Sequence, residues 1–226
     1  MWSFLHAIVL SAQDGGALTP PAGWRSWNQY QGAITQTIIE RALHELARVR
    51  DLPDGTRASL ASLGYNVAGV DDGWQRCGHY GHLSYRYHDA DGTPVVDSNR
   101  FPSMLNLTRL GKSLGLGVGW YGNACGCVDG CCSDHCDSVE CFAGDVDATI
   151  KYGFSSYKID GCGAQRDIGL WYAMFNHSLR QLPGAQPIVL ENCHDGDGEP
   201  EGNRPHRDAE GELWCSFHSY RTPTLR

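Results

Sequence analysis

The sequence predicts an α/β protein of the (β/α)8 TIM-type barrel class, and three observations support this. From residue 22 onward, short apolar segments alternate with amphipathic helical patterns, as expected for βα units and a parallel sheet. Polar and aromatic residues gather at the carboxyl ends of the predicted strands, where barrels of this class carry their functional groups. An open doubly wound sheet normally has a single ligand-binding switch point, whereas polar residues follow six predicted strands in this chain. The barrel is therefore favoured.

Six strands are predicted, each a short apolar run bounded by polar or turn-forming residues. They cover residues 22–30, 64–74, 116–125, 155–163, 187–193 and 213–221. Their carboxyl ends carry side chains able to contact a polar ligand: Trp27, Asp71, Asp72, Tyr121, Lys158, Asp160, Glu191 and Arg221. In a parallel barrel these side chains converge at one end of the sheet.

Helical periodicity separates the strands and predicts helices over residues 35–49, 106–115, 145–153 and 170–182. The apolar face of the first helix is predicted to comprise Ile34, Ile38, Ala42, Leu43 and Leu46. Asp145 is the predicted N-cap of the third helix, because a carboxylate satisfies free backbone N–H groups at a helix start. Residues 194–212, rich in Gly, Asp, Glu and Pro, form a predicted loop.

The composition of the chain limits the classes of partner that it is expected to bind. The chain has 226 residues, 41% of them hydrophobic, and a formal net charge of −8, so it can form a substantial core. An acidic chain without a run of Lys or Arg is not expected to bind nucleic acid or an anionic membrane surface. Ten cysteines, six of them between Cys125 and Cys141, are more than a typical cytosolic enzyme carries.

Several features predict passage through the secretory pathway. The apolar run at residues 2–10, followed by small residues, resembles a short signal peptide, although it lacks a basic start. We therefore expect a leader at residues 1–17 and one partial domain at 18–226. Sequons at Asn106 and Asn176 fit a secreted, glycosylated protein, and a secreted or lysosomal/vacuolar location is expected.

The segment Ser155–Gly163 raises the question of function most sharply. In a strand, Lys158, Asp160 and Cys162 share one face, either as a surface stripe or as the lining of a site. Lys158 and Asp160 also fit a structural ion pair, Asp71–Asp72 fits a helix N-cap, and Trp24 and Trp27 fit ordinary core positions. Together, however, carboxylates, a Lys and aromatic rings suit a pyranose site. Carboxylates grip sugar hydroxyls, and aromatic rings pack on the apolar sugar face.

Five ordered motifs carry a resemblance: TPPAGWRSWNQY, GVDDGW, LGVGWYGNAC, SSYKIDGCG and YRT. In order and spacing they resemble glycoside hydrolase family 27, the α-galactosidases and α-N-acetylgalactosaminidases, from about residue 18 to the C-terminus. The resemblance implies a retaining mechanism with Asp160 as nucleophile and no cofactor. It implies that the sugar is bound by Asp71, Asp72, Lys158, Arg221 and either Trp24 or Trp27, with Tyr121, Glu191 and His194 as further substrate-binding candidates.

The resemblance also implies that Cys125 pairs with Cys162, and a second disulfide is expected between Cys193 and Cys215. The six other cysteines are even in number and allow 15 connectivities, which the sequence leaves open. They are Cys77, Cys127, Cys131, Cys132, Cys136 and Cys141. A zinc site within residues 127–141 is the rival interpretation, but the spacings do not match paired zinc knuckles. No metal is expected.

Three departures from the family pattern are visible. Gly73 stands where many members carry a Cys. His194 stands where galactose-preferring members place a Glu, so the sequence leaves open whether the bound sugar is galactose or N-acetylgalactosamine. Leu225 stands where the family has its acid/base Asp, so the acid/base is absent from the chain. A (β/α)8 barrel needs about 250 residues, and this chain has 226. We expect an incomplete barrel of about six βα units without the C-terminal β-sandwich. Its function is either hydrolysis of terminal α-galactosides or galactose binding without catalysis.

Overall fold

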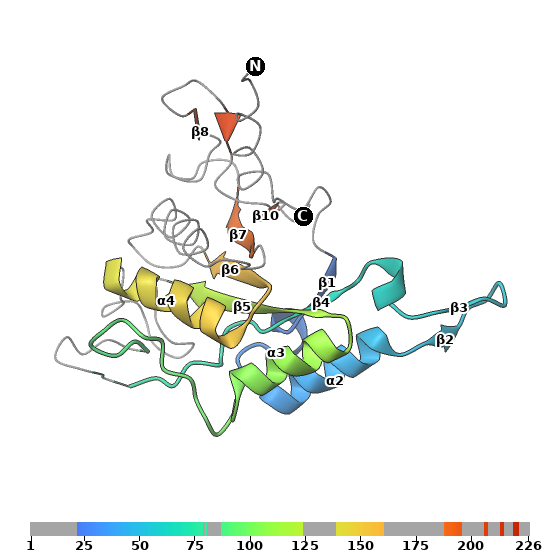
Figure 1. Cartoon of the computed structure of the whole chain (residues 1–226), viewed down its shortest axis with the longest axis horizontal. Helices are drawn as coiled ribbons and strands as arrows, with labels where there is room; N and C mark the ends of the chain where they lie inside the picture. The colour runs from blue at the N-terminus through green and yellow to red at the C-terminus, as the bar shows by residue number, and fades with distance from the viewer. Residues whose placement is uncertain are drawn as a thin grey trace, which may run out of the picture.

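The computed structural model describes residues 22–78, 80, 87–123, 139–160, 188–195, 206–207, 213–214 and 219–221. Its central element is a six-stranded sheet in which all neighbouring strands are parallel. In spatial order the strands are β1 (Gly23–Arg25), β4 (Val67–Gly69), β5 (Gly117–Asn123), β6 (Ser156–Asp160), β7 (Val189–Asp195) and β10 (Ser219–Arg221) (Figure 1). This order follows the chain without the reversal of a doubly wound sheet, as the predicted barrel class requires.

One ion pair shows that the sheet is strongly curled. The Arg25 guanidinium on β1 lies 2.7 Å from the Glu191 carboxylate on β7, although β4, β5 and β6 separate the two strands. In a flat sheet, four strand spacings of about 4.8 Å would place these strands about 19 Å apart. The sheet therefore bends toward a barrel, with Arg25 and Glu191 on its concave face.

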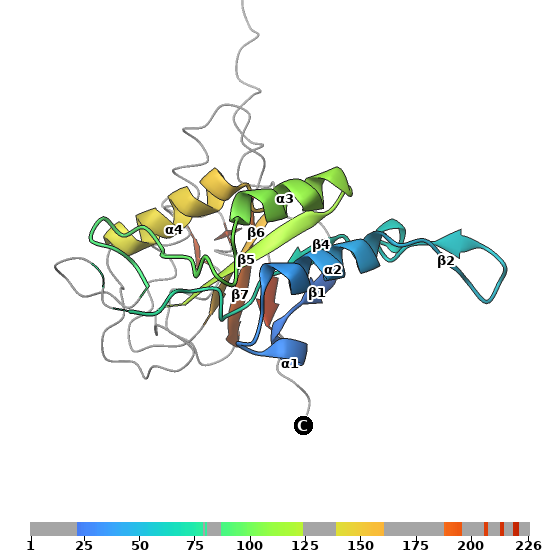
Figure 2. The same cartoon turned by 90° about the horizontal axis from the view of Figure 1, so that it is seen from below.

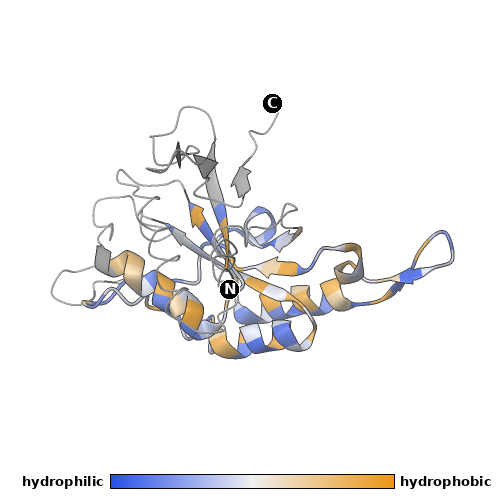
Figure 3. Cartoon of the chain, turned by 45° about the horizontal axis from the view of Figure 1, so that its top comes forward, coloured by the Kyte–Doolittle hydropathy of each residue, from blue (hydrophilic) through white to orange (hydrophobic). Residues whose placement is uncertain are grey.

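Three helices cover the convex face of the sheet. They are α2 (Gln36–Ala47), α3 (Met104–Ser113) and α4 (Val139–Tyr152), which lie in a row with α3 in the middle (Figures 1 and 2). Hydrophobic residues on α2 recur at helical spacing (Figure 3), and Ile39, Leu43 and Leu46 are buried. The prediction of Ile38 and Ala42 in this face was wrong by one position, because the i, i+4, i+7 set that starts at Ile39 faces the sheet while Ile38 and Ala42 are only half-buried.

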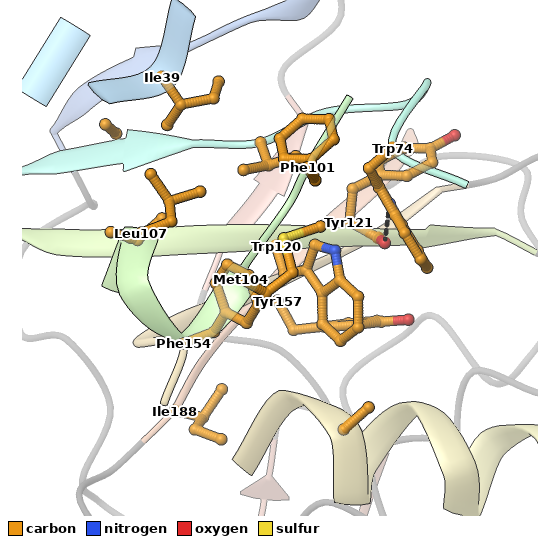
Figure 4. Packing of buried hydrophobic residues seen from close by; sticks show 14 of the residues in the cluster. Ile39, Trp74, Phe101, Met104, Leu107, Trp120, Tyr121, Phe154, Tyr157 and Ile188 are labelled. Carbon is orange, nitrogen blue, oxygen red and sulfur yellow. Dashed lines mark hydrogen bonds between the residues drawn. The ribbon is translucent and has the colours of Figure 1, made fainter. Parts of the chain in front are cut away.

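The core between sheet and helices is rich in aromatic rings (Figure 4). Trp120 on β5 stacks on Phe154 with a ring separation of 4.8 Å and an interplanar angle of 13°, and it also contacts Trp74. Because side chains alternate along a strand, Trp120 and Tyr157 face the helices while Tyr121 and Lys158 face the concave side. The strand pattern thus separates a packed core from a polar interior.

Helix α4 begins at Val139, six residues earlier than predicted, so Asp145 lies inside the helix and is not its N-cap. The Asp145 side chain is 1% exposed and lies 2.9 Å from His88 Nε2, which is equally buried. A partner 57 residues away in the sequence stabilises this carboxylate inside the helix, and no local pattern could have indicated that contact.

The remaining described elements are short. They are α1 (Trp27–Tyr30), the 3-10 turn η1 (Ala61–Leu63), a hairpin of β2 (Arg50–Asp51) with β3 (Arg57–Ala58) that projects from the body, and β8 (His206–Arg207) paired with β9 (Leu213–Trp214) (Figure 1). The strand predicted over 213–221 is therefore two strands, of which only β10 joins the main sheet. The predicted leader and the predicted helix at 170–182 lie outside the described residues. Within the described part, no helix has both the length and the apolar character needed to span a bilayer.

Candidate active site

Three adjacent strands bring the predicted polar residues to one end of the sheet. Asp71 follows β4 by two residues, Tyr121 lies on β5, and Lys158 and Asp160 lie on β6. Tyr121 is in register with Lys158 on the neighbouring strand. Residues in register on parallel strands face the same side of the sheet, so these side chains share the concave face.

The first contact of the site is an ion pair between Lys158 and Asp71. Lys158 Nζ donates to Asp71 Oδ2 at 2.8 Å, and Asp71 is 1% exposed. The other oxygen, Oδ1, accepts from the backbone N–H of Asp72 at 2.9 Å, and the backbone N–H of Asp71 donates to Ser26 Oγ. Lys158 Nζ also lies 5.1 Å from the centre of the Tyr121 ring. Both charged groups are therefore held in fixed positions.

The second contact orients Asp160. The Tyr121 hydroxyl donates to Asp160 Oδ2 at 2.6 Å and accepts from Asn123 Nδ2 at 3.1 Å. Because a phenol has one proton, the amide donor of Asn123 leaves that proton to point at Asp160. Burial, helped by the charges of Asp72 and Asp160, raises the pKa of Tyr121 well above 10. Tyr121 therefore stays a hydrogen-bond donor to this carboxylate at physiological pH.

The surroundings of Asp72 strongly favour its neutral form. Burial raises its pKa from 3.8 to about 6, and the nearby charges of Asp71 and Asp160 add to the effect. The backbone N–H of Gly73 donates to Asp72 Oδ1 at 2.9 Å. Gly73 has φ +105°, and a Cβ there would lie 2.5 Å from the carbonyl oxygen of Gly32, so glycine is required in this backbone. A Cys side chain at this position would therefore be strained and would crowd Gly32.

Replacing Asp72 by Asn is expected to raise the free energy of unfolding at pH 7.5 by about 2–3 kcal/mol and to change it little at pH 4. The folded-state pKa of Asp72 lies above the unfolded value, so ionisation costs folding free energy that is absent below pH 3.8 and complete above about pH 6. Urea unfolding of both proteins at the two pH values measures this difference. An equal effect of the substitution at both pH values would contradict the raised pKa.

Comparison with known proteins adds to this geometry. No family model matches the chain. Alpha-galactosidase 3 of Arabidopsis thaliana is 30% identical over 154 residues, which cover 68% of this chain and 30% of the relative. Alpha-N-acetylgalactosaminidase of Gallus gallus is 29% identical over 161 residues, or 66% of this chain and 35% of the relative. The chain thus spans about a third of the length of these curated relatives.

Solved structures agree with the sequence relatives. The crystal structure of alpha-galactosidase I from Mortierella vinacea superposes with a TM-score of 0.59 and 25% identity over 80% of this chain and 42% of that chain. The chain belongs to glycoside hydrolase family 27. A family 27 β-L-arabinopyranosidase from Geobacillus stearothermophilus, with a TM-score of 0.57 over 81% of this chain and 50% of its own, shares the fold at 16% identity.

The structure brings five predicted members of the family 27 site together: Asp71, Asp72, Tyr121, Lys158 and Asp160. The two tryptophans differ in their surroundings. Trp24 is half-buried against the core and packs edge-on against Tyr30, whereas Trp27 is 40% exposed at the start of α1. Of the two, Trp27 is the more exposed.

Glu191 lies inside β7 and not at its end, level with Lys158, and its carboxylate binds Arg25. Sequence reasoning missed Arg25, which stands between Trp24 and Ser26 in a segment predicted to run from strand to loop. The available signal was alternation, which places Arg25 opposite Trp24 and therefore on the interior face.

Other predictions fall partly or wholly outside the described side chains. His194 and Cys193 lie on β7, and Arg221 ends β10, where it is in register with Asp195. Cys125, Cys162 and Cys215 lie outside the described residues, so both predicted disulfides stay predictions. Cys77 and Cys141 are each disulfide-bonded. Within the described part of the chain, no group of three His, Cys, Asp or Glu is arranged to hold a metal ion.

Proposed function

We propose that this chain carries the sugar-binding and nucleophilic residues of a retaining α-galactosidase. The observation that carries the proposal is the position of Asp160 on the concave face. It is oriented by Tyr121 and stands two residues from a Lys158 that is paired with Asp71. A carboxylate that is held in position by Tyr121, beside a second carboxylate–lysine pair, suits attack on a sugar bound by its hydroxyls. The relatives from Arabidopsis thaliana and Oryza sativa, which match 68% and 88% of this chain, are named alpha-galactosidases, which supports this reaction class.

In the proposed mechanism an oxygen of Asp160 attacks the anomeric carbon of the sugar. A carbon–oxygen bond to Asp160 forms as the bond to the leaving group breaks, and the leaving oxygen takes a proton from a general acid. Water then hydrolyses the covalent glycosyl-enzyme and frees Asp160. The described residues assign no general acid, so the role of this chain's own residues is to bind the sugar, orient the nucleophile and form the covalent bond.

Sugar recognition is proposed to rest on the carboxylates and Lys158. Asp71 and Asp72 accept hydrogen bonds from sugar hydroxyls, and Lys158 donates to a hydroxyl oxygen while it fixes Asp71. The exposed ring of Trp27 is the proposed stacking surface for the apolar face of the sugar, and His194 and Arg221 are proposed to complete the pocket. Because the carboxylate of Asp72 has a pKa of about 6, galactose affinity should fall as the pH is lowered through that value.

A second candidate function is sugar binding without hydrolysis. The observation that favours it is Leu225, which stands where the family pattern places the acid/base Asp. Removal of a general acid typically slows a reaction by about 10²–10⁴-fold, and the loss is smallest for leaving groups that need no proton. The two candidates therefore differ in their response to an activated substrate.

The test measures hydrolysis of a dinitrophenyl α-galactoside and galactose binding by calorimetry. We expect galactose binding together with release of dinitrophenol, because this leaving group departs without an acid. Binding without release would support the binding-only function. Neither binding nor release would contradict the proposed site, and equal hydrolysis of the matching α-glucoside would contradict its galactose specificity.

The proposed compartment is the secretory pathway. Disulfide bonds at Cys77 and Cys141 are compatible with an oxidising compartment. The sequon residue Asn106 is exposed on α3, so its side chain is accessible to a glycan.

A further inference from the structure

Arg25 lies beside Asp71 of the proposed sugar site and makes several polar contacts that no sequence motif indicated. Its guanidinium donates to Glu191 Oε2 at 2.7 Å and to the carbonyl oxygens of Val70 at 3.0 Å and Trp120 at 3.3 Å. Its Nε lies 3.9 Å from Asp71 Oδ2. One side chain on β1 therefore contacts groups on or next to β4, β5 and β7.

The strands around Arg25 leave room for this guanidinium. Arg25 is in register with Gly69, and Gly69 is in register with Gly119 on the next strand. A Cβ added at Gly69 would lie 2.8 Å from Arg25 Cζ, and one added at Gly119 would lie 3.2 Å from an Arg25 Nη. Two neighbouring strands thus lack side chains on the interior face at the level where Arg25 crosses toward Glu191.

Two cations, Arg25 and Lys158, lie near the carboxylates of Asp71 and Glu191. Each cation makes its shortest contact with a different carboxylate. Lys158 is in register with Glu191 on the neighbouring strand β7, which makes Glu191 an available partner for it. Lys158 nevertheless binds Asp71 at 2.8 Å, and Glu191 binds Arg25 at 2.7 Å. Because Arg25 already binds the Glu191 carboxylate, Lys158 pairs with Asp71 instead.

We propose that Arg25 is a positioning residue that sets this pairing and thereby keeps Asp71 and Lys158 in the geometry that binds sugar hydroxyls. This inference rests on the proposed function only in its effect on sugar affinity. In the absence of Arg25, Glu191 and Asp71 are two partly or fully buried carboxylates that share one lysine. Lys158 then moves toward Glu191, its neighbour in register, and Asp71 loses its partner. Glu191 accordingly serves as the counter-ion of Arg25 and not as a sugar ligand.

Calorimetry with galactose on Arg25→Met, Glu191→Gln and the double variant tests the inference. Loss of one partner of a desolvated pair leaves the other charge unpaired, so Arg25→Met should weaken galactose binding by about 10-fold or more. The double variant removes the competing carboxylate as well, and it should recover most of that loss. Arg57→Met, which breaks the exposed pair with Asp51, is the matched control and should not change the affinity.

Two outcomes would overturn the inference. One is a double variant that binds galactose no better than Arg25→Met. The other is a Glu191→Gln variant that loses as much affinity as Arg25→Met, because Glu191 would then contact the sugar itself. If Arg25→Met does not fold, Gly69→Ala replaces it, since its Cβ displaces the guanidinium without removing any charge. Gly69→Ala should weaken binding in the same direction, and unchanged affinity would count against the inference.

A crystal structure of the variant separates this inference from the proposed function. If the unaltered chain binds no galactose, the proposed function fails, but the pairing can still be observed. In the Arg25→Met structure we expect Lys158 Nζ within hydrogen-bond distance of Glu191. Lys158 still on Asp71, as in the unaltered chain, would show that Arg25 does not set the pairing.

Discussion

Replacing Lys158 by Met is expected to abolish galactose binding and to lower the free energy of unfolding by about 3–5 kcal/mol. Asp71 is 1% exposed and has Lys158 as its closest cation, at 2.8 Å, while Arg25 is 3.9 Å away. The substitution leaves a buried carboxylate without its main counter-charge, and such a carboxylate is costly in the folded state. It also removes a donor to the sugar, so affinity and stability should fall together.

Chemical denaturation and calorimetry measure the two effects of Lys158→Met. Lys112→Met, which neutralises an exposed lysine in the last turn of α3, is the matched control and should change neither quantity by more than a small amount. A second variant, Lys158→Met with Asp71→Asn, should recover stability because the unpaired charge is gone, but it should not recover binding. Full stability in the single variant would show that the ion pair contributes nothing to the fold.

Replacing Asp160 by Asn is expected to lower turnover of a dinitrophenyl α-galactoside by about 10⁴-fold or more, because an amide cannot take the place of the attacking carboxylate. The fold should be retained. Tyr121 can donate to an amide oxygen as it does to Asp160 Oδ2, and the substitution removes one negative charge from a site that also contains Asp71 and Asp72. Galactose should therefore still bind, and the loss should appear in kcat more than in KM.

The control for this substitution is Asp147→Asn, which changes an exposed carboxylate on α4. Turnover by this variant should equal that of the unaltered chain. If Asp160→Asn retained a comparable rate, another group would have to form the bond to the sugar.

The fold was predictable because its signals are local. Each strand of the main sheet overlaps a predicted range, although the ranges around β1 and β4 are several residues too long and β7 runs two residues beyond its predicted end. The βα alternation is enough to indicate a parallel sheet. The errors also have local causes. Ile38 and Ile39 are equally apolar, and only the packing of α2 on the sheet decides which is buried. Asp145 fits an N-cap by sequence, and only the distant His88 reveals that it belongs inside α4.

The site was predictable as a set of residues but not as a set of contacts. Strand ends and family motifs indicate Asp71, Lys158 and Asp160, because parallel strands deliver their carboxyl-terminal residues to one place. That Tyr121 orients Asp160 depends on register between β5 and β6, which no sequence pattern specifies. The role of Arg25 depends on the curl of the sheet, which brings β1 close to β7. It also depends on the absence of side chains at Gly69 and Gly119, where the guanidinium lies.

The most direct test of the account is covalent trapping. The chain is incubated with a fluorinated galactosyl fluoride, whose leaving group needs no acid and whose glycosyl-enzyme hydrolyses slowly, and the intact mass and peptide map are recorded. The account predicts release of the anomeric fluoride and one added fluorogalactosyl unit, attached to Asp160 and absent from Asp160→Asn. An adduct on a different residue, or no adduct on a chain that binds galactose, would contradict the assignment of Asp160 as the nucleophile.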